Sequence, residues 1–147
     1  MPEQSAAERK AAEAQLARLV TKFSPGQESL VAAARKWVRK RLPTAHEVAY
    51  EYKSWFVTSF SPSGKGYEGV LSIRGDADGI KLYFNPGKGL PDPGKLLKGS
   101  AQVRWIPLEA ASTLARPAVA QLADAVIARS PVPFSAKGNG SLTVKAK

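Results

Sequence analysis

The chain has 147 residues, 44% of them hydrophobic, and carries 22 Lys and Arg against 12 Asp and Glu, for a net charge of +10. This length supports one compact core and is short for two ordinary domains. The lack of cysteine excludes disulfides, thiolate-held metal clusters and cysteine nucleophiles. The positive charge favours encounters with anions, but it also serves solubility, so it identifies no ligand by itself.

No stretch of the sequence approaches the roughly 20 apolar residues of a membrane-spanning helix. Residues 1–15 are charged and rich in alanine, without the apolar segment of a signal peptide. We therefore expect no membrane partner and a cytoplasmic location. The sequence does not indicate the oligomeric state.

Two helices are expected at the start of the chain. The first covers residues 5–22 and is expected to be peripheral as part of a segment 1–23. Ser24 is expected to cap the second helix, with Gln27 completing a capping box and Pro43 ending the helix. Residues 24–130 are expected to form the single domain.

Strands follow from residue 46, where the hydrophobic period changes from helical to two. The segments EGVLSIR and GIKLYFN flank GDAD and predict a β-hairpin. The segment AQVRWIPL predicts one more strand, with Val103 and Trp105 on its inner face. Apolar residues at helical spacing then predict a helix over residues 117–129.

The tail, residues 131–147, is polar and rich in glycine and serine, so we expect it to be flexible. Its segment SLTVKA offers the alternative of an edge strand. The element order predicts an α+β fold. We expect a two-layer sandwich, in which an antiparallel sheet of about 4–6 strands has the N-terminal and C-terminal helices packed on one face. The other face should be partly open.

The segment NPGKGLPDPGKLLKG, residues 85–99, is explained by turn and helix chemistry. Pro86 and Gly87 suit a type II turn. Asp92 suits the N-cap of a helix of one to two turns, and Gly99 suits the position after its end. We therefore expect a strand, a turn and a short helix here.

This segment also carries a family resemblance. The stretch GIKLYFNPGKGLPDPGKLLKGSAQVRWIPL, with WVRKRLPTAHEVAYEY before it and PAVAQLADAVIA after it, resembles the family named domain of unknown function 1801. The resemblance covers about residues 28–130 and is most specific over residues 79–106. It implies a small α/β sandwich likened to frataxin. It also implies iron as a candidate cofactor, because some relatives are described as iron chaperones, and it brings no catalytic residues.

An iron site would need several acidic or histidine side chains to converge. His46 is the single histidine of the chain, and Glu47 and Glu51 share a strand face. These three residues are the metal candidates, although a basic protein repels free cations.

Gly64, Gly66 and Gly69 match the G-x-G-x-x-G pattern of dinucleotide-binding loops. They lie between two expected strands, however, and not between a strand and a helix. A hairpin loop is therefore expected. Asp76 and Asp78 are expected to serve a turn and not a calcium loop, because the distal glutamate of that loop is missing.

The basic residues favour binding of an anion. Outward cations and aromatic rings on the sheet, with cations on the second helix, suit an anionic ligand or single-stranded nucleic acid. The candidate residues are Arg74, Lys81, Tyr83, Asn85, Arg104, Arg35 and Arg39. The alternative is a solvated sheet face, whose charges prevent association between sheets.

The sequence thus predicts a non-enzymatic binding domain for an anionic ligand, which binds through a basic sheet face and the second helix. Catalysis has little support, because no nucleophile-elbow pattern or placed carboxylate pair is present. A frataxin-like iron chaperone and a small enzyme with an unrecognised cleft stay open as alternatives. A protein partner stays open as well.

Overall fold

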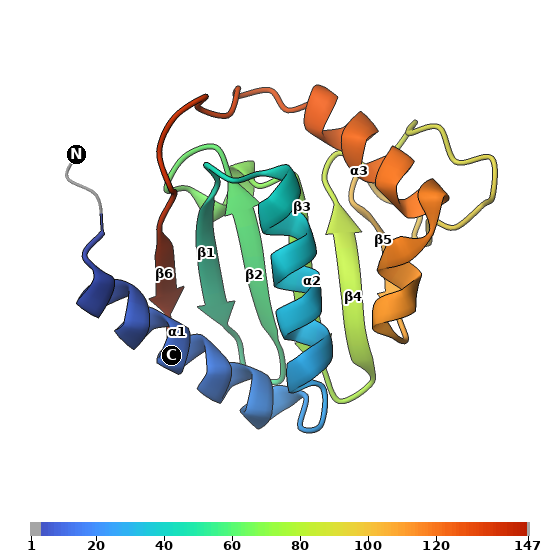
Figure 1. Cartoon of the computed structure of the whole chain (residues 1–147). Helices are drawn as coiled ribbons and strands as arrows, with labels where there is room; N and C mark the ends of the chain where they lie inside the picture. Colours follow the sequence, from blue (N-terminus) through green and yellow to red (C-terminus); the bar gives the residue numbers. More distant parts are fainter. Residues whose placement is uncertain (1–3, 147) are drawn as a thin grey trace.

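A computed structural model describes residues 4–146 and shows the expected α+β fold. Helices lie together in front of one face of a sheet (Figure 1). The elements in chain order are α1 (Ala6–Phe23), α2 (Glu28–Arg41), β1 (His46–Glu51), β2 (Phe56–Ser61), η1 (Gly66–Glu68), β3 (Leu71–Asp76), β4 (Gly79–Phe84), β5 (Arg104–Leu108), η2 (Ala111–Ala115), α3 (Pro117–Ala128) and β6 (Leu142–Lys145), where η marks a 3₁₀ helix. No helix within the described residues is long and apolar enough to cross a membrane.

The sheet has six strands in the order β5-β4-β3-β2-β1-β6. All neighbouring strands are antiparallel except β1 and β6, which are parallel. The expectation of a purely antiparallel sheet is therefore wrong at this edge. The chain after α3 runs over the end of the sheet (Figure 1), so β6 enters from the same end as β1. Such a crossover connection is what parallel neighbours require.

Helix α1 belongs to the core. Ser5 caps it in a capping box with Glu8, which satisfies backbone N–H groups at the start of the helix. Its residues Leu16, Leu19 and Val20 are buried within the same apolar cluster as the sheet. The expectation of a peripheral first helix is therefore wrong.

Ser24 closes α1 and does not cap α2. Its backbone N–H donates to the carbonyl of Val20, and its hydroxyl donates to the carbonyl of Asp76 at 3.0 Å. Helix α2 begins after Gln27, which makes no side-chain capping bond. The predicted capping box is wrong because Gly26, with a φ of 87°, turns the chain between the two helices.

The core lies between the helices and the inner face of the sheet. In the central hairpin, Leu71 and Ile73 of β3 pair in register with Phe84 and Leu82 of β4, which confirms the predicted hairpin and its buried face. On the helix side of the core, the predicted apolar stripe of α3 is confirmed as well. Its fully buried members are Val119, Leu122, Ala123 and Val126.

The segment between β4 and β5 contains no helix. Asp92 accepts hydrogen bonds from the backbone N–H groups of Leu96 and Leu97, each at 2.9 Å, so its carboxylate closes a turn. Lys95 has a φ of 53°, which is incompatible with a right-handed helix. The predicted short helix is therefore wrong. The predicted type II turn is wrong too, because Gly87 has no positive φ.

The predicted flexible tail is wrong for Leu142–Lys145, which form β6 and confirm the alternative of an edge strand in SLTVKA. Leu142 is fully buried against the core. The side-chain amide of Gln4 holds the outer edge of this strand, because it donates to the carbonyl of Leu142 at 2.7 Å and accepts from its N–H at 2.9 Å. The amide thus takes the place of a neighbouring strand at that residue.

Candidate ligand-binding face

The sheet face opposite the helices carries aromatic and cationic side chains. Because directly paired residues point to the same side of a sheet, the strand register assigns them. Val57 pairs with Arg74, Arg74 with Lys81, and Tyr83 with Trp105. Their neighbours along each strand point into the core, so these side chains lie on the face away from the helices. We call this surface the open face.

A hollow of about 420 Å³ lies on the open face, which is within the range of roughly 300–1,000 Å³ common for ligand pockets. Aromatic rings dominate its lining, and Arg74 is the only described lining residue that is charged at neutral pH. The aromatic, charged and amide residues of the lining are Tyr50, Tyr52, Trp55, Tyr67, Arg74, Tyr83 and Asn85. Arg74, Tyr83 and Asn85 therefore lie together, as the sequence predicts.

Trp55 forms a fixed wall of the hollow. The ring of Tyr52 stacks on it with centroids 4.0 Å apart, and the guanidinium carbon of Arg74 lies 3.9 Å from its centroid. Two groups this close to one ring centroid occupy opposite faces of the ring. Such cation–π and stacking contacts each stabilise an arrangement by about 0.5–1.5 kcal/mol. Arg74 is therefore held in place at the hollow.

The guanidinium of Arg74 retains hydrogen-bonding capacity. It makes no hydrogen bond within residues 4–146, and its nearest carboxylate oxygen, on Asp76, lies 3.9 Å from Nε. A guanidinium has five N–H donors in a planar fork that suits a phosphate or a carboxylate. Nε is buried, so the Nη groups are the donors with which Arg74 can bind an anion without first losing a hydrogen bond to the protein.

The segment with η1 forms another wall of the hollow, and its glycines allow it to approach the sheet. A Cβ on Gly66 would lie 2.4 Å from the hydroxyl oxygen of Tyr50, and one on Gly69 would lie 2.0 Å from the hydroxyl oxygen of Ser59. The G-x-G-x-x-G stretch lies between β2 and β3, as predicted from its context. Close packing on the open face explains Gly66 and Gly69.

Lysines flank the hollow on both sides. Lys81 of β4 lies 4.6 Å from the ring centroid of Trp105, which in turn lies 6.3 Å from that of Tyr83. Lys145 of β6 lies 5.6 Å from the ring centroid of Tyr50. The centre of the open face is thus aromatic, and its cations stand at Arg74 and on the two sides.

Arg104 does not belong to the open face. It pairs with Phe84, which is fully buried on the helix side. Val103, expected in the core, precedes β5 and is 36% exposed. The predicted orientation of this strand is inverted, so Trp105 takes the outward position expected for Arg104.

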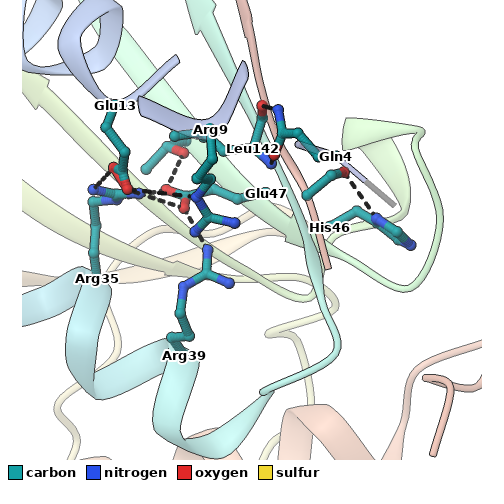
Figure 2. A network of polar contacts seen from close by, with 10 residues as sticks. Gln4, Arg9, Glu13, Arg35, Arg39, His46, Glu47 and Leu142 are labelled. Carbon is teal, nitrogen blue, oxygen red and sulfur yellow. Dashed lines mark hydrogen bonds and ion pairs between the residues drawn. The ribbon is translucent and has the colours of Figure 1, made fainter. Parts of the chain in front are cut away.

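Arg35 and Arg39 of α2 point into the protein, where they bind the carboxylate of Glu47 (Figure 2). Arg35 donates from Nε and Nη2 to the two carboxylate oxygens at 2.8 and 2.7 Å, and Arg39 donates from Nη2 at 2.7 Å. Thr58 adds a hydrogen bond at 2.6 Å. The anion that these two arginines bind is therefore the carboxylate of Glu47, and their predicted contribution to an anion site on the surface is wrong.

The side chain of Glu47 is fully buried yet charged. Burial by itself would raise its pKa, but the hydrogen bonds and charge of Arg35, with those of Thr58 and Arg39, outweigh burial and hold the pKa below its usual range. Glu13 of α1 also contacts Arg35, at 2.6 Å. The network ties both helices to β1.

The metal candidates do not converge. The carboxylate of Glu47 is already bonded to its arginine and threonine partners. His46, the preceding residue of the strand, points to the other face and contacts the hydroxyl of Ser141 at 2.9 Å. Glu51 contacts Lys22 at 2.6 Å. Among residues 4–146, no three His, Cys, Asp or Glu side chains form a cluster that could hold a metal ion.

Comparisons with protein-family models, curated proteins and solved structures found no match. The resemblance of residues 28–130 to the domain of unknown function 1801 family therefore stays a prediction.

Sequence reasoning missed most of the aromatic residues on this face. Trp55, Tyr67 and Trp105 were not among the predicted site residues. The sequence did contain a signal for Trp105, because the strand of Trp105 follows the strand of Tyr83 and paired residues of neighbouring strands share one face of the sheet. No local pattern places Tyr67, which reaches the hollow through the loop around η1.

Proposed function

We propose that the protein binds an anionic ligand through the open face. The observation that carries this proposal is the guanidinium of Arg74, which stacks on Trp55 at the edge of a hollow and whose Nη groups make no hydrogen bond within residues 4–146. Lys81 and Lys145 add positive charge at the sides, and the net charge of +10 favours the encounter with an anion.

The lining favours binding over catalysis. None of the described residues that line the hollow is Asp, Glu, His or Lys, the side chains that most often transfer protons in active sites. Aromatic rings and a few polar groups are typical of ligand pockets. The cytoplasmic location expected from the sequence is part of this proposal, and fractionation of cells that express the protein tests it.

The test compares two double variants, each of which loses two positive charges, from a different surface. One variant, Arg74→Gln with Lys81→Gln, alters the open face, and the control, Lys36→Gln with Lys40→Gln, alters exposed lysines of α2 on the helix side. Short inorganic polyphosphate is titrated into each protein at low and moderate salt, and binding is followed by calorimetry.

We expect the open-face variant to lose most of the salt-sensitive binding, while the α2 variant keeps it. Equal binding by both variants would show that the anion responds only to net charge, and would reject the open face as the site. Circular dichroism of each variant confirms that the fold is retained.

A further inference from the structure

We propose that the ligand of the open face is single-stranded nucleic acid, with a base in the hollow and the phosphates on the flanking cations. This inference rests on the proposed anion binding and names its ligand. Four features of the face support it: the central rings, an unpaired amide, the spread of the cations and a continuation of the hollow.

The central rings match a ligand that has planar groups of its own. Tyr67 is 75% exposed and Tyr52 40% exposed, and Tyr67 makes no ring contact within the described residues. Bases of a single strand stack on such rings, whichever base is present. An anion without a planar group, such as free phosphate, would gain nothing from them, so the aromatic lining favours a base.

The amide of Asn85 offers hydrogen bonds to a base edge. Its side chain lines the hollow and makes no hydrogen bond within residues 4–146. An amide carries two donors and an acceptor, which suits the edge of an unpaired base. The hydroxyls of Ser59 and Ser72 are occupied, because Ser72 donates to Ser59 at 3.0 Å and Ser59 donates to the carbonyl of Gly66. The amide of Asn85 is therefore available for the base, beside the guanidinium of Arg74 and the hydroxyls of the lining tyrosines.

The cations are spread across the sheet and not gathered at one point. Lys145 lies on β6 and Lys81 on β4, four strand positions apart in the sheet order. At about 4.8 Å per strand, this separation is about 19 Å. Phosphates in a stacked strand repeat every ~3.4 Å, so about six nucleotides cover this width. A mononucleotide cannot contact both lysines.

The hollow also continues beyond its own walls. A second hollow of about 230 Å³ shares Tyr67, Gly69 and Asn85 with the first and extends past Glu68 to Pro131 and Val132. A chain of nucleotides can pass from one hollow to the other beside Tyr67. This continuity favours a strand over a single small anion.

The decisive experiment separates the bases from the phosphates. A short labelled thymidine strand and a strand of equal length that lacks bases are titrated into the full-length protein, with thymidine monophosphate and the corresponding duplex as further probes. We expect the thymidine strand to bind at least about fivefold more tightly than the strand without bases, from stacking alone. The monophosphate and the duplex should bind more weakly than the thymidine strand.

Variants at Tyr67 test the ring with little risk to the fold, because this side chain is exposed. Tyr67→Leu should weaken binding of the thymidine strand about fivefold or more and leave the strand without bases unchanged. Tyr67→Phe keeps the ring and should keep the affinity.

Equal affinity of the two strands would overturn the nucleic-acid inference, as would equal affinity for the monophosphate or the duplex. Polyphosphate binding that depends on Arg74 and Lys81 would then still support the proposed anion site. If neither the strands nor polyphosphate distinguish the open-face variant from the α2 variant, both proposals fail.

Discussion

Arg35 donates two hydrogen bonds to the carboxylate of Glu47, from Nε at 2.8 Å and from Nη2 at 2.7 Å, and solvent does not reach this carboxylate. This pair joins α2 to β1 across the helix–sheet interface (Figure 2). The same pair explains why the cations of α2 are not all available to a ligand.

Replacing one member of this pair should be costly. Glu47→Gln removes the buried anion between Arg35 and Arg39 and leaves Arg35 with the partly exposed Glu13 alone, so we expect the free energy of unfolding to fall by about 3–5 kcal/mol. Urea denaturation measures the change. The control Glu109→Gln, at an exposed glutamate, should change stability by less than about 0.5 kcal/mol.

Replacing both members should cost much less. In the double variant Glu47→Leu with Arg35→Met, both charges of the pair are gone, while Thr58 and the partly exposed Arg39 each lose one hydrogen bond. Apolar replacements of buried ion pairs are often neutral or stabilising. We expect urea denaturation to show recovery of most of the stability lost in Glu47→Gln. A double variant as unstable as the single one would contradict the desolvation argument.

Stability should fall in acid through Glu47. Its pKa is lower in the folded protein than the value of about 4.3 for an unfolded chain, so the unfolded state binds a proton first as the pH falls. The stabilisation is complete above the unfolded pKa and is lost as the pH falls through the folded pKa. Urea midpoints between about pH 7 and pH 3 should show this slope, and Glu47→Gln should flatten it.

The glycines around η1 should differ sharply in their tolerance of a side chain. Gly66→Ala places a methyl group 2.4 Å from the Tyr50 hydroxyl, whereas Gly64→Ala meets nothing within 4 Å. We expect Gly66→Ala to lower the free energy of unfolding by about 1–3 kcal/mol and Gly64→Ala to change it by less than about 0.5 kcal/mol. Thermal denaturation compares them, and equal melting temperatures would show that η1 does not pack on Tyr50.

The edge strand β6 should depend on Gln4. Gln4→Ala removes both hydrogen bonds to the backbone of Leu142, each contributing about 0.5–1.5 kcal/mol. We expect the Leu142 amide to exchange its hydrogen faster, as measured by nuclear magnetic resonance. Gln121→Ala, at an exposed position of α3, should leave this exchange unchanged.

Local periodicity was sufficient for much of the fold. The stripe of α3 and the alternation in the β3–β4 hairpin each depend on residues a few positions apart, so the sequence contains the whole signal. The β5 strand shows the limit. Alternation tells which residues share a face, but it does not tell which face is buried. The set Val103 and Trp105 and the set Arg104 and Ile106 each contain an apolar residue, so either set could face the core.

The candidate site was predicted in part for the same reason. Arg74, Lys81, Tyr83 and Asn85 follow from the alternation of two correctly predicted strands. The aromatic walls come from segments that meet only in the folded protein, as when the loop around η1 brings Tyr67 to the same hollow as Tyr52 and Trp55.

The sequence by itself determined the fold class, most of the helices and strands, and the presence of an excess of positive charge. Only the tertiary structure decided which cations are available. Arg35 and Arg39 look like surface residues of a basic helix until β1 places Glu47 beside them, whereas the guanidinium of Arg74 makes no hydrogen bond within residues 4–146. Charge is a property of each residue, but its neutralisation depends on partners that are distant in sequence.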